Sequence, residues 1–292
     1  MAIFDRIPAD AKRELAWFLG LTFGLSWLFW LVPLTYYGSP ITRQSIRSVG
    51  QIGATLMPGL AAVITTRWIA RRELRALNLG RLGPKRFYLW ALLLPYALVL
   101  VALCIALSLG AASLDMMRVR GLLFPEAYLG AGIVSMLGVL GAILLSPFIS
   151  AALNLGGELG WRGYLLPVLL PLGKWRAILL SSAAWGLWHA PLILQARPHF
   201  ESPLLNLLLT MGFYLFVGAI LSWLYLETKS PWTPAVALGV IVEAERLAIL
   251  FLEPRALSVE RGLLASPVGW IGMALFIAWL IYTRRLPRTL DE

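Results

Sequence analysis

The sequence predicts an all-α membrane protein, a polytopic bundle of about eight transmembrane helices. Hydrophobic residues make up 59% of the 292-residue chain and charged residues only 14%, whereas a soluble domain has roughly 25% charged residues. The charge is missing because long stretches carry none, and a stretch of about 20 apolar residues crosses about 30 Å of hydrocarbon. Backbone polar groups in lipid need partners within their own segment, so these stretches are predicted to be helices.

Eight apolar runs follow one another along the chain, and each is predicted to cross the bilayer once. They cover residues 15–37, 48–68, 88–110, 127–153, 175–196, 203–226, 231–252 and 266–283. Tryptophan and tyrosine lie near many ends of the runs, which is typical of the headgroup region. The loops are too short for a soluble domain, so residues 1–292 are predicted to form a single transmembrane domain. Residues 1–14 are predicted to be cytoplasmic or interfacial.

The basic residues orient the predicted spans. The densest group lies in the loop from Arg67 to Arg86, and a cytoplasmic N-terminus places most other Lys and Arg residues on the same side. The positive-inside rule therefore predicts a multi-pass protein of the cell membrane with both termini in the cytoplasm. The net charge of +10 is interpreted as topology and contact with anionic lipid, so the predicted partner is the lipid bilayer and not nucleic acid.

A small set of ionisable side chains lies inside the predicted C-terminal spans or follows the fourth span with little polar spacing. They are Glu158, Arg162, His189, Glu243, Glu245 and Arg246. A charged side chain at the bilayer centre costs about 2.5–3.5 kcal/mol on insertion scales, so such residues usually face the bundle interior or a wet cavity. By default they indicate a functional site.

Two short segments place these residues on shared helix faces. Glu158 and Arg162 are four residues apart, with the acid before the base, and this arrangement favours an ion pair on one face. Trp185 and His189 are also four residues apart, and His189 is the only histidine within a predicted span. A buried histidine is commonly a packing residue, so the spacing indicates a functional role for His189 without establishing it.

These segments resemble the motifs of the CPBP family of intramembrane proteases (CAAX protease and bacteriocin-processing, also called the ABI family). The similarity is carried by Glu-Leu-Gly-Trp-Arg-Gly-Tyr-Leu-Leu-Pro from Glu158 onward and by Ser-Ser-Ala-Ala-Trp-Gly-Leu-Trp-His-Ala-Pro around His189. It covers about residues 130–250, which the resemblance identifies as a CPBP-like core. Membership would imply metal-dependent cleavage, with zinc the expected metal, of a membrane-bound peptide or prenylated protein.

The chain departs from the family pattern of Glu-Glu-x-x-x-Arg, then Phe-x-x-x-His, then His-x-x-x-Asn or Asp. Gly157 stands where the resemblance places the first glutamate, which is regarded as the base. Gly239 stands at the third-motif histidine and Glu243 at the asparagine. Glu158, Arg162 and His189 match the pattern, and tryptophan replaces phenylalanine at position 185. Glycine supplies neither a base nor a metal ligand.

Three hypotheses follow from these departures. The favoured one is a relative with impaired or no peptidase activity that keeps a polar intramembrane cavity and binds a membrane peptide, lipid or partner protein. The second is an active endopeptidase using Glu158, Arg162, His189 and the relocated carboxylate of Glu243, with His189 and Glu158 as candidate zinc ligands. The third, a transporter or scaffold, is weaker because the polar residues occupy one half of the chain. The combined change of Gly157→Glu and Gly239→His is predicted to help rebuild a site.

Overall fold

The computed structural model describes residues 7–31, 40–123, 132–195, 202–253 and 262–285. Within these ranges the chain is helical, and the extended structure amounts to a single antiparallel bridge between Leu114 and Leu252. The predicted all-α membrane bundle is confirmed.

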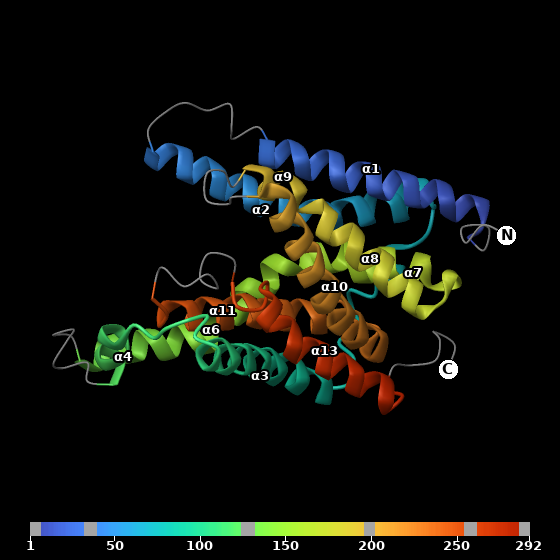
Figure 1. Cartoon of the computed structure of the whole chain (residues 1–292). Coiled ribbons are helices and arrows are strands. Elements are labelled where there is room, and N and C mark those ends of the chain that lie inside the picture. The colour runs from blue at the N-terminus through green and yellow to red at the C-terminus, as the bar shows by residue number, and fades with distance from the viewer. Residues whose placement is uncertain (1–6, 32–39, 124–131, 196–201, 254–261, 286–292) are drawn as a thin grey trace.

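The helices are shown in Figure 1. In chain order they are α1 (Ala9–Leu31), α2 (Pro40–Ile64), the π-helix η3 (Thr65–Ile69), the 3₁₀-helix η4 (Leu74–Leu77), α3 (Arg86–Ser108), α4 (Met116–Leu123), α6 (Gly132–Glu158), the π-helix η5 (Leu159–Leu165), α7 (Leu166–Leu169), the 3₁₀-helix η6 (Leu170–Leu172), α8 (Lys174–Trp188), α9 (Ala190–Gln195), α10 (Pro203–Thr228), α11 (Trp232–Leu250) and α13 (Pro267–Tyr282).

Four of the described helical stretches are long and apolar enough to cross a membrane. They are Ala9–Leu31, Ser45–Ile69, Arg86–Ser108 and Pro203–Thr228, and α13 is a shorter apolar helix. The chain is a multi-pass membrane protein. The other predicted spans also contain helices, but α8 has only 15 residues and α11 carries three charged residues.

The predicted span at 175–196 is divided in two. Helix α8 ends at Trp188, and α9 begins at Ala190, so His189 lies at the break and not inside one continuous helix. Pro191 contributes to the break, because proline has no N–H to donate to the carbonyl of Leu187 four residues earlier. Residue 196 and those that follow it up to 201, with His199, fall outside the described ranges.

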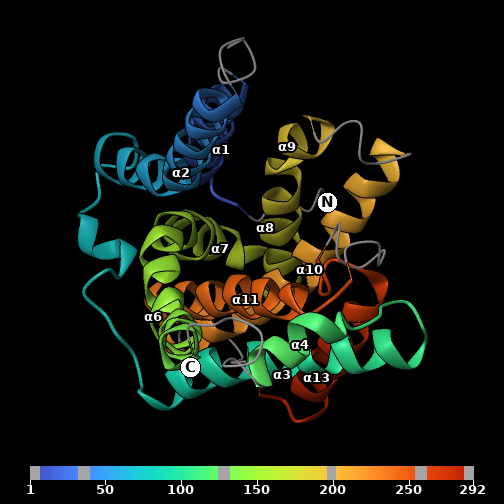
Figure 2. The same ribbon diagram turned by 90° about the vertical axis from the view of Figure 1, so that its left-hand side faces the viewer.

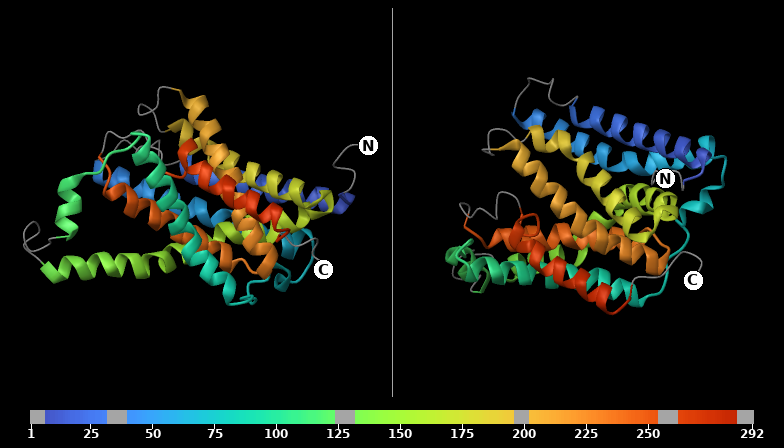
Figure 3. Two further views of the ribbon diagram at one scale, coloured as in Figure 1. Left: turned by 60° about the horizontal axis from the view of Figure 1, so that its bottom comes forward. Right: turned by 45° about the vertical axis from the view of Figure 1, so that its right-hand side comes forward.

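The bundle has an outer pair of helices on each side and a group of helices between them. Helix α1 packs against α2, and α3 packs against α13, while α6, α8, α10 and α11 lie between these pairs (Figures 1 and 2). Helix α11 packs along both α6 and α3, and α10 packs against α8. Helix α4 and the start of α6 extend beyond the rest of the bundle (Figure 3). The opposite end of α6, which continues into η5, lies inside the bundle, where α6 packs against α2 and α11.

Close backbone contact joins α2 to the end of α6 and to η5. A Cβ atom added to Gly59 would lie 2.5 Å from the Gly156 carbonyl oxygen, and one added to Gly160 would lie 2.5 Å from the Pro58 carbonyl oxygen. Real Cβ atoms do not approach so closely, so only glycine allows the two segments to pack this tightly. The contact fixes the backbone on both sides of Glu158.

Candidate functional site

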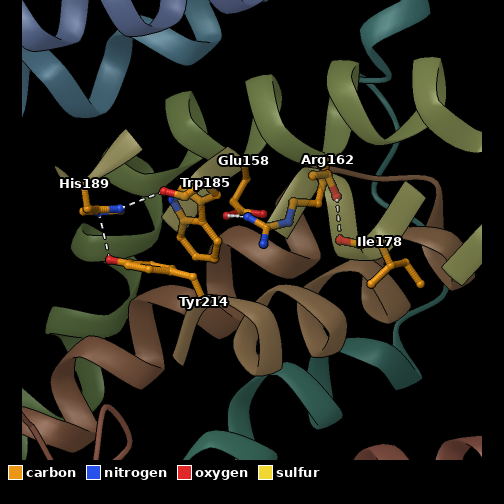
Figure 4. Close-up of polar contacts among 7 residues, drawn as sticks. Glu158, Arg162, Ile178, Trp185, His189 and Tyr214 are labelled. Carbon is orange, nitrogen blue, oxygen red and sulfur yellow. Dashed lines mark hydrogen bonds and ion pairs between the residues drawn. The ribbon is translucent and has the colours of Figure 1, made fainter. Parts of the chain in front are cut away.

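A buried ion pair lies where α6 passes into the π-helix η5. The Arg162 Nη1 atom donates to Glu158 Oε1 at 2.7 Å, and the two side chains are 1% and 0% exposed. The pairing predicted from the four-residue spacing is present (Figure 4). Single-turn π segments frequently mark functional sites, and this one begins directly after Glu158.

An aromatic ring contacts this ion pair. The Arg162 guanidinium carbon lies 4.1 Å from the ring centroid of Trp185, which is a cation–π contact. Glu158 Oε2 and the Arg162 Nε and Nη2 atoms have no hydrogen-bond partner among the described residues. A buried pair that leaves atoms unsatisfied recovers only part of its desolvation cost, so its net contribution to stability is small, although removal of one partner alone is costly.

His189 is held by partners on both ring nitrogens. Its Nδ1 atom lies 3.0 Å from the Trp185 carbonyl oxygen, and its Nε2 atom lies 2.8 Å from the Tyr214 hydroxyl. Because a carbonyl only accepts, the network assigns the proton to Nδ1, and the Tyr214 hydroxyl donates to Nε2. The two rings also stack, with centroids 4.2 Å apart.

Trp185 connects the histidine to the ion pair. Its ring contacts the Arg162 guanidinium and lies 4.4 Å from the Tyr214 ring. Glu158, Arg162, Trp185 and His189 therefore form one continuous cluster with Tyr214 (Figure 4). The sequence predictions did not include Tyr214. A signal was present, because a tyrosine in the middle of an apolar span needs a partner for its hydroxyl.

Glu243 is engaged with other groups. Its Oε1 atom accepts from Ser150 Oγ at 2.6 Å and from Arg246 Nη1 at 3.0 Å. The Arg246 contact is the i,i+3 pair that the spacing allows. Glu245, two residues later, instead accepts from the Leu264 backbone N–H. The carboxylate proposed as a relocated ligand thus has its own partners.

The two glycines at the altered motif positions differ in the space around them. A Cβ added to Gly157 would lie 3.7 Å from the Thr55 carbonyl oxygen, which is ordinary van der Waals contact. A Cβ added to Gly239 would lie 2.5 Å from the Pro147 carbonyl oxygen and 2.8 Å from the Ala151 nitrogen. Position 239 is where α11 packs directly on the backbone of α6, and it has no room for a histidine.

Residues 133–241 match the family model described as type II CAAX prenyl endopeptidase Rce1-like. The chain carries an Rce1-like domain of the CPBP family. The resemblance predicted from the motifs is confirmed, and the matched range contains Glu158, Arg162, His189 and both altered glycines. Among curated proteins, no match to the chain is found.

The zinc that the family resemblance implies does not fit the described part of this Rce1-like domain. Within the described ranges, no three His, Cys, Asp or Glu side chains lie close enough together to hold a metal ion. Both His189 nitrogens have protein partners, and Glu158 Oε1 is occupied by Arg162. The predicted rebuilding of the site by Gly157→Glu and Gly239→His therefore meets an obstacle at position 239, where the second ligand would stand.

Proposed function

We propose that this Rce1-like membrane protein binds a membrane-embedded peptide or protein without cleaving it by the family's chemistry. The observation that carries the proposal is the packing of Gly239 on the backbone of α6, at distances that exclude a side chain. If only the histidine side chain of the third motif had been lost, the space that it occupied would remain open. Here the space at the third motif is filled by the neighbouring helix.

The remaining groups support the same conclusion. A general base must come within hydrogen-bond reach of the water that it deprotonates. Glu158 is fully buried and paired with Arg162, and His189 is paired on both sides. In this proposal the ion pair and the aromatic cluster hold α6, α8 and α10 in the family's arrangement, and they carry no reaction.

The ligand class follows from the activity that the family's description names and from the membrane setting of the domain. Type II CAAX prenyl endopeptidases act on prenylated proteins, so a prenylated C-terminal peptide is the first ligand to test. The proposed location is the cell membrane with both termini in the cytoplasm, because the basic loop from Arg67 to Arg86 favours that side.

Purified full-length protein in liposomes, mixed with a fluorogenic prenylated CAAX peptide, tests the proposal. We expect the peptide to bind, measured by fluorescence anisotropy, with turnover no higher than in Glu158→Gln and His189→Ala. The His199→Ala variant is the matched control, since it removes the chain's other histidine. Turnover that is lost in the first two variants and kept in the control would overturn the non-catalytic assignment. Absence of binding would overturn the prenyl-peptide assignment.

A further inference from the structure

A second feature lies away from the Rce1-like site, where the start of α1 meets the end of α2. A cavity of about 590 Å³ is lined there by Asp10, Arg13 and Trp17 of α1 and by Trp68 and Arg71 of η3 and the turn that follows it. This volume falls within the range of about 300–1,000 Å³ that is typical of small-molecule sites. None of the predicted site residues lines this cavity.

The cavity lies at the level of a membrane surface. One candidate span begins at Ala9, and the next ends at Ile69, so this end of both spans meets the same face of the bilayer. Trp17 and Trp68 are 52% and 65% exposed. Trp68 lies at the end of its span, and exposed tryptophans at span ends are typical of the headgroup region, so the cavity opens where phospholipid headgroups lie.

The charged groups on the cavity wall are of two kinds. The Glu14 carboxylate is occupied, because it forms an ion pair with Arg72 and accepts from the Tyr164 hydroxyl at 3.3 Å. Asp10, Arg13 and Arg71 line the same wall, and their side chains make no hydrogen bond or ion pair with any residue that the structure describes. Two guanidinium groups and one carboxylate therefore face the cavity without partners among the described residues.

Arg71 also has an unusual backbone. Its φ angle is +53°, in the left-handed region that residues other than glycine rarely adopt. Such conformations persist where the surrounding structure determines them, and they are often found at ligand-binding sites. The Glu14–Arg72 pair and the Glu14–Tyr164 contact supply that support, because they tie the turn to α1 and to η5.

We propose that this cavity binds the headgroup of phosphatidylethanolamine. Guanidinium groups match phosphate oxygens in a two-pronged geometry, which assigns the lipid phosphate to Arg13 and Arg71. A primary ammonium donates hydrogen bonds to a carboxylate, which assigns the ethanolamine to Asp10. Phosphatidylglycerol offers no cation to Asp10, and the ammonium of phosphatidylcholine has no N–H to donate.

Native mass spectrometry of the full-length protein in detergent tests this assignment by titration with the three lipids. We expect phosphatidylethanolamine to bind at least about fivefold more tightly than the other two. The Arg13→Gln and Arg71→Gln variants should each weaken it about tenfold or more, since each removes a hydrogen bond between charged groups. Arg71→Gly should weaken binding equally while relaxing the left-handed backbone, so misfolding would not explain the loss.

The matched control is Arg67→Gln, because Arg67 is exposed beside this turn but does not line the cavity. It should leave phosphatidylethanolamine affinity unchanged, and Asp10→Asn should abolish the preference over phosphatidylglycerol. An equal loss in Arg67→Gln, or a preference for phosphatidylglycerol, would assign the binding to general surface charge and overturn the proposal. If soluble glycerophosphoethanolamine bound as tightly as the lipid, the assignment of the ligand as a lipid would be overturned. The outcome is independent of peptide cleavage.

Discussion

Positions 157 and 239 both carry glycine where the CPBP pattern has a catalytic side chain, yet their surroundings differ. Around Gly157 the nearest atoms lie at ordinary contact distance. Around Gly239 the backbone of α6 occupies the place of a Cβ atom. The first loss leaves the local structure open to a side chain, whereas the second has become part of the packing between α11 and α6. Two substitutions that are alike in sequence therefore differ in how readily they could be reversed.

The same contrast separates the two parts of the candidate site. The part built from the end of α6, η5, α8 and α10 keeps Glu158, Arg162 and His189 in one cluster with Trp185 and Tyr214. The part built from α11 offers Glu243, which is bound to Ser150 and Arg246. A cluster retained without its catalytic partners is expected to act in folding, and substitutions in each part test this difference.

The largest effect is expected from breaking the retained ion pair. Glu158→Leu leaves the Arg162 guanidinium buried without a counter-charge, so the free energy of unfolding should fall by about 3–5 kcal/mol. The double variant Glu158→Leu, Arg162→Met should recover most of this loss, because a buried pair can often be replaced by apolar groups. Unfolding in mixed micelles, followed by tryptophan fluorescence, measures both. If the free energy of unfolding fell further in the double variant than in Glu158→Leu, the two side chains would not act as a structural pair.

A smaller loss is expected from crowding the contact between α11 and α6. Gly239→Ala should lower the free energy of unfolding by about 1–3 kcal/mol, and Gly239→His by more, because the helices must separate to admit a side chain. Gly20→Ala on α1 is the control, since nothing lies within 4 Å of its added Cβ. A Gly239→Ala variant as stable as this control would refute the packing argument that supports the proposed function.

Much of the fold and part of the site could be predicted from the sequence. Apolar runs predicted the helical membrane class, and helical spacing predicted the pair of Glu158 with Arg162. These predictions hold because each depends on one helix alone. The break at His189 precedes Pro191, but a proline alone does not predict a break here, because Pro58, Pro95 and Pro147 lie inside unbroken helices.

The remaining features depend on contacts between distant segments. Tyr214 reaches His189 from α10, and the space at Gly239 is set by the backbone of α6. No spacing rule within a single helix contains that information. The cavity at Arg13 and Arg71 is similar, because the sequence shows a basic loop but not that it closes against α1.

The smallest expected effect is a gain in stability, opposite in sign to the losses above. It gives the sharpest comparison of positions 157 and 239. Gly157→Ala should raise the free energy of unfolding by about 0.5–1 kcal/mol, since alanine is the better residue in a helix interior and its Cβ fits here. The matched variant is Gly160→Ala in the same segment, whose added Cβ would lie 2.5 Å from the Pro58 carbonyl oxygen and should destabilise. The same unfolding measurement decides both. If Gly157→Ala were as harmful as Gly160→Ala, both lost motif positions would be closed by packing. A gain in stability would instead make position 157 the place from which to rebuild a carboxylate.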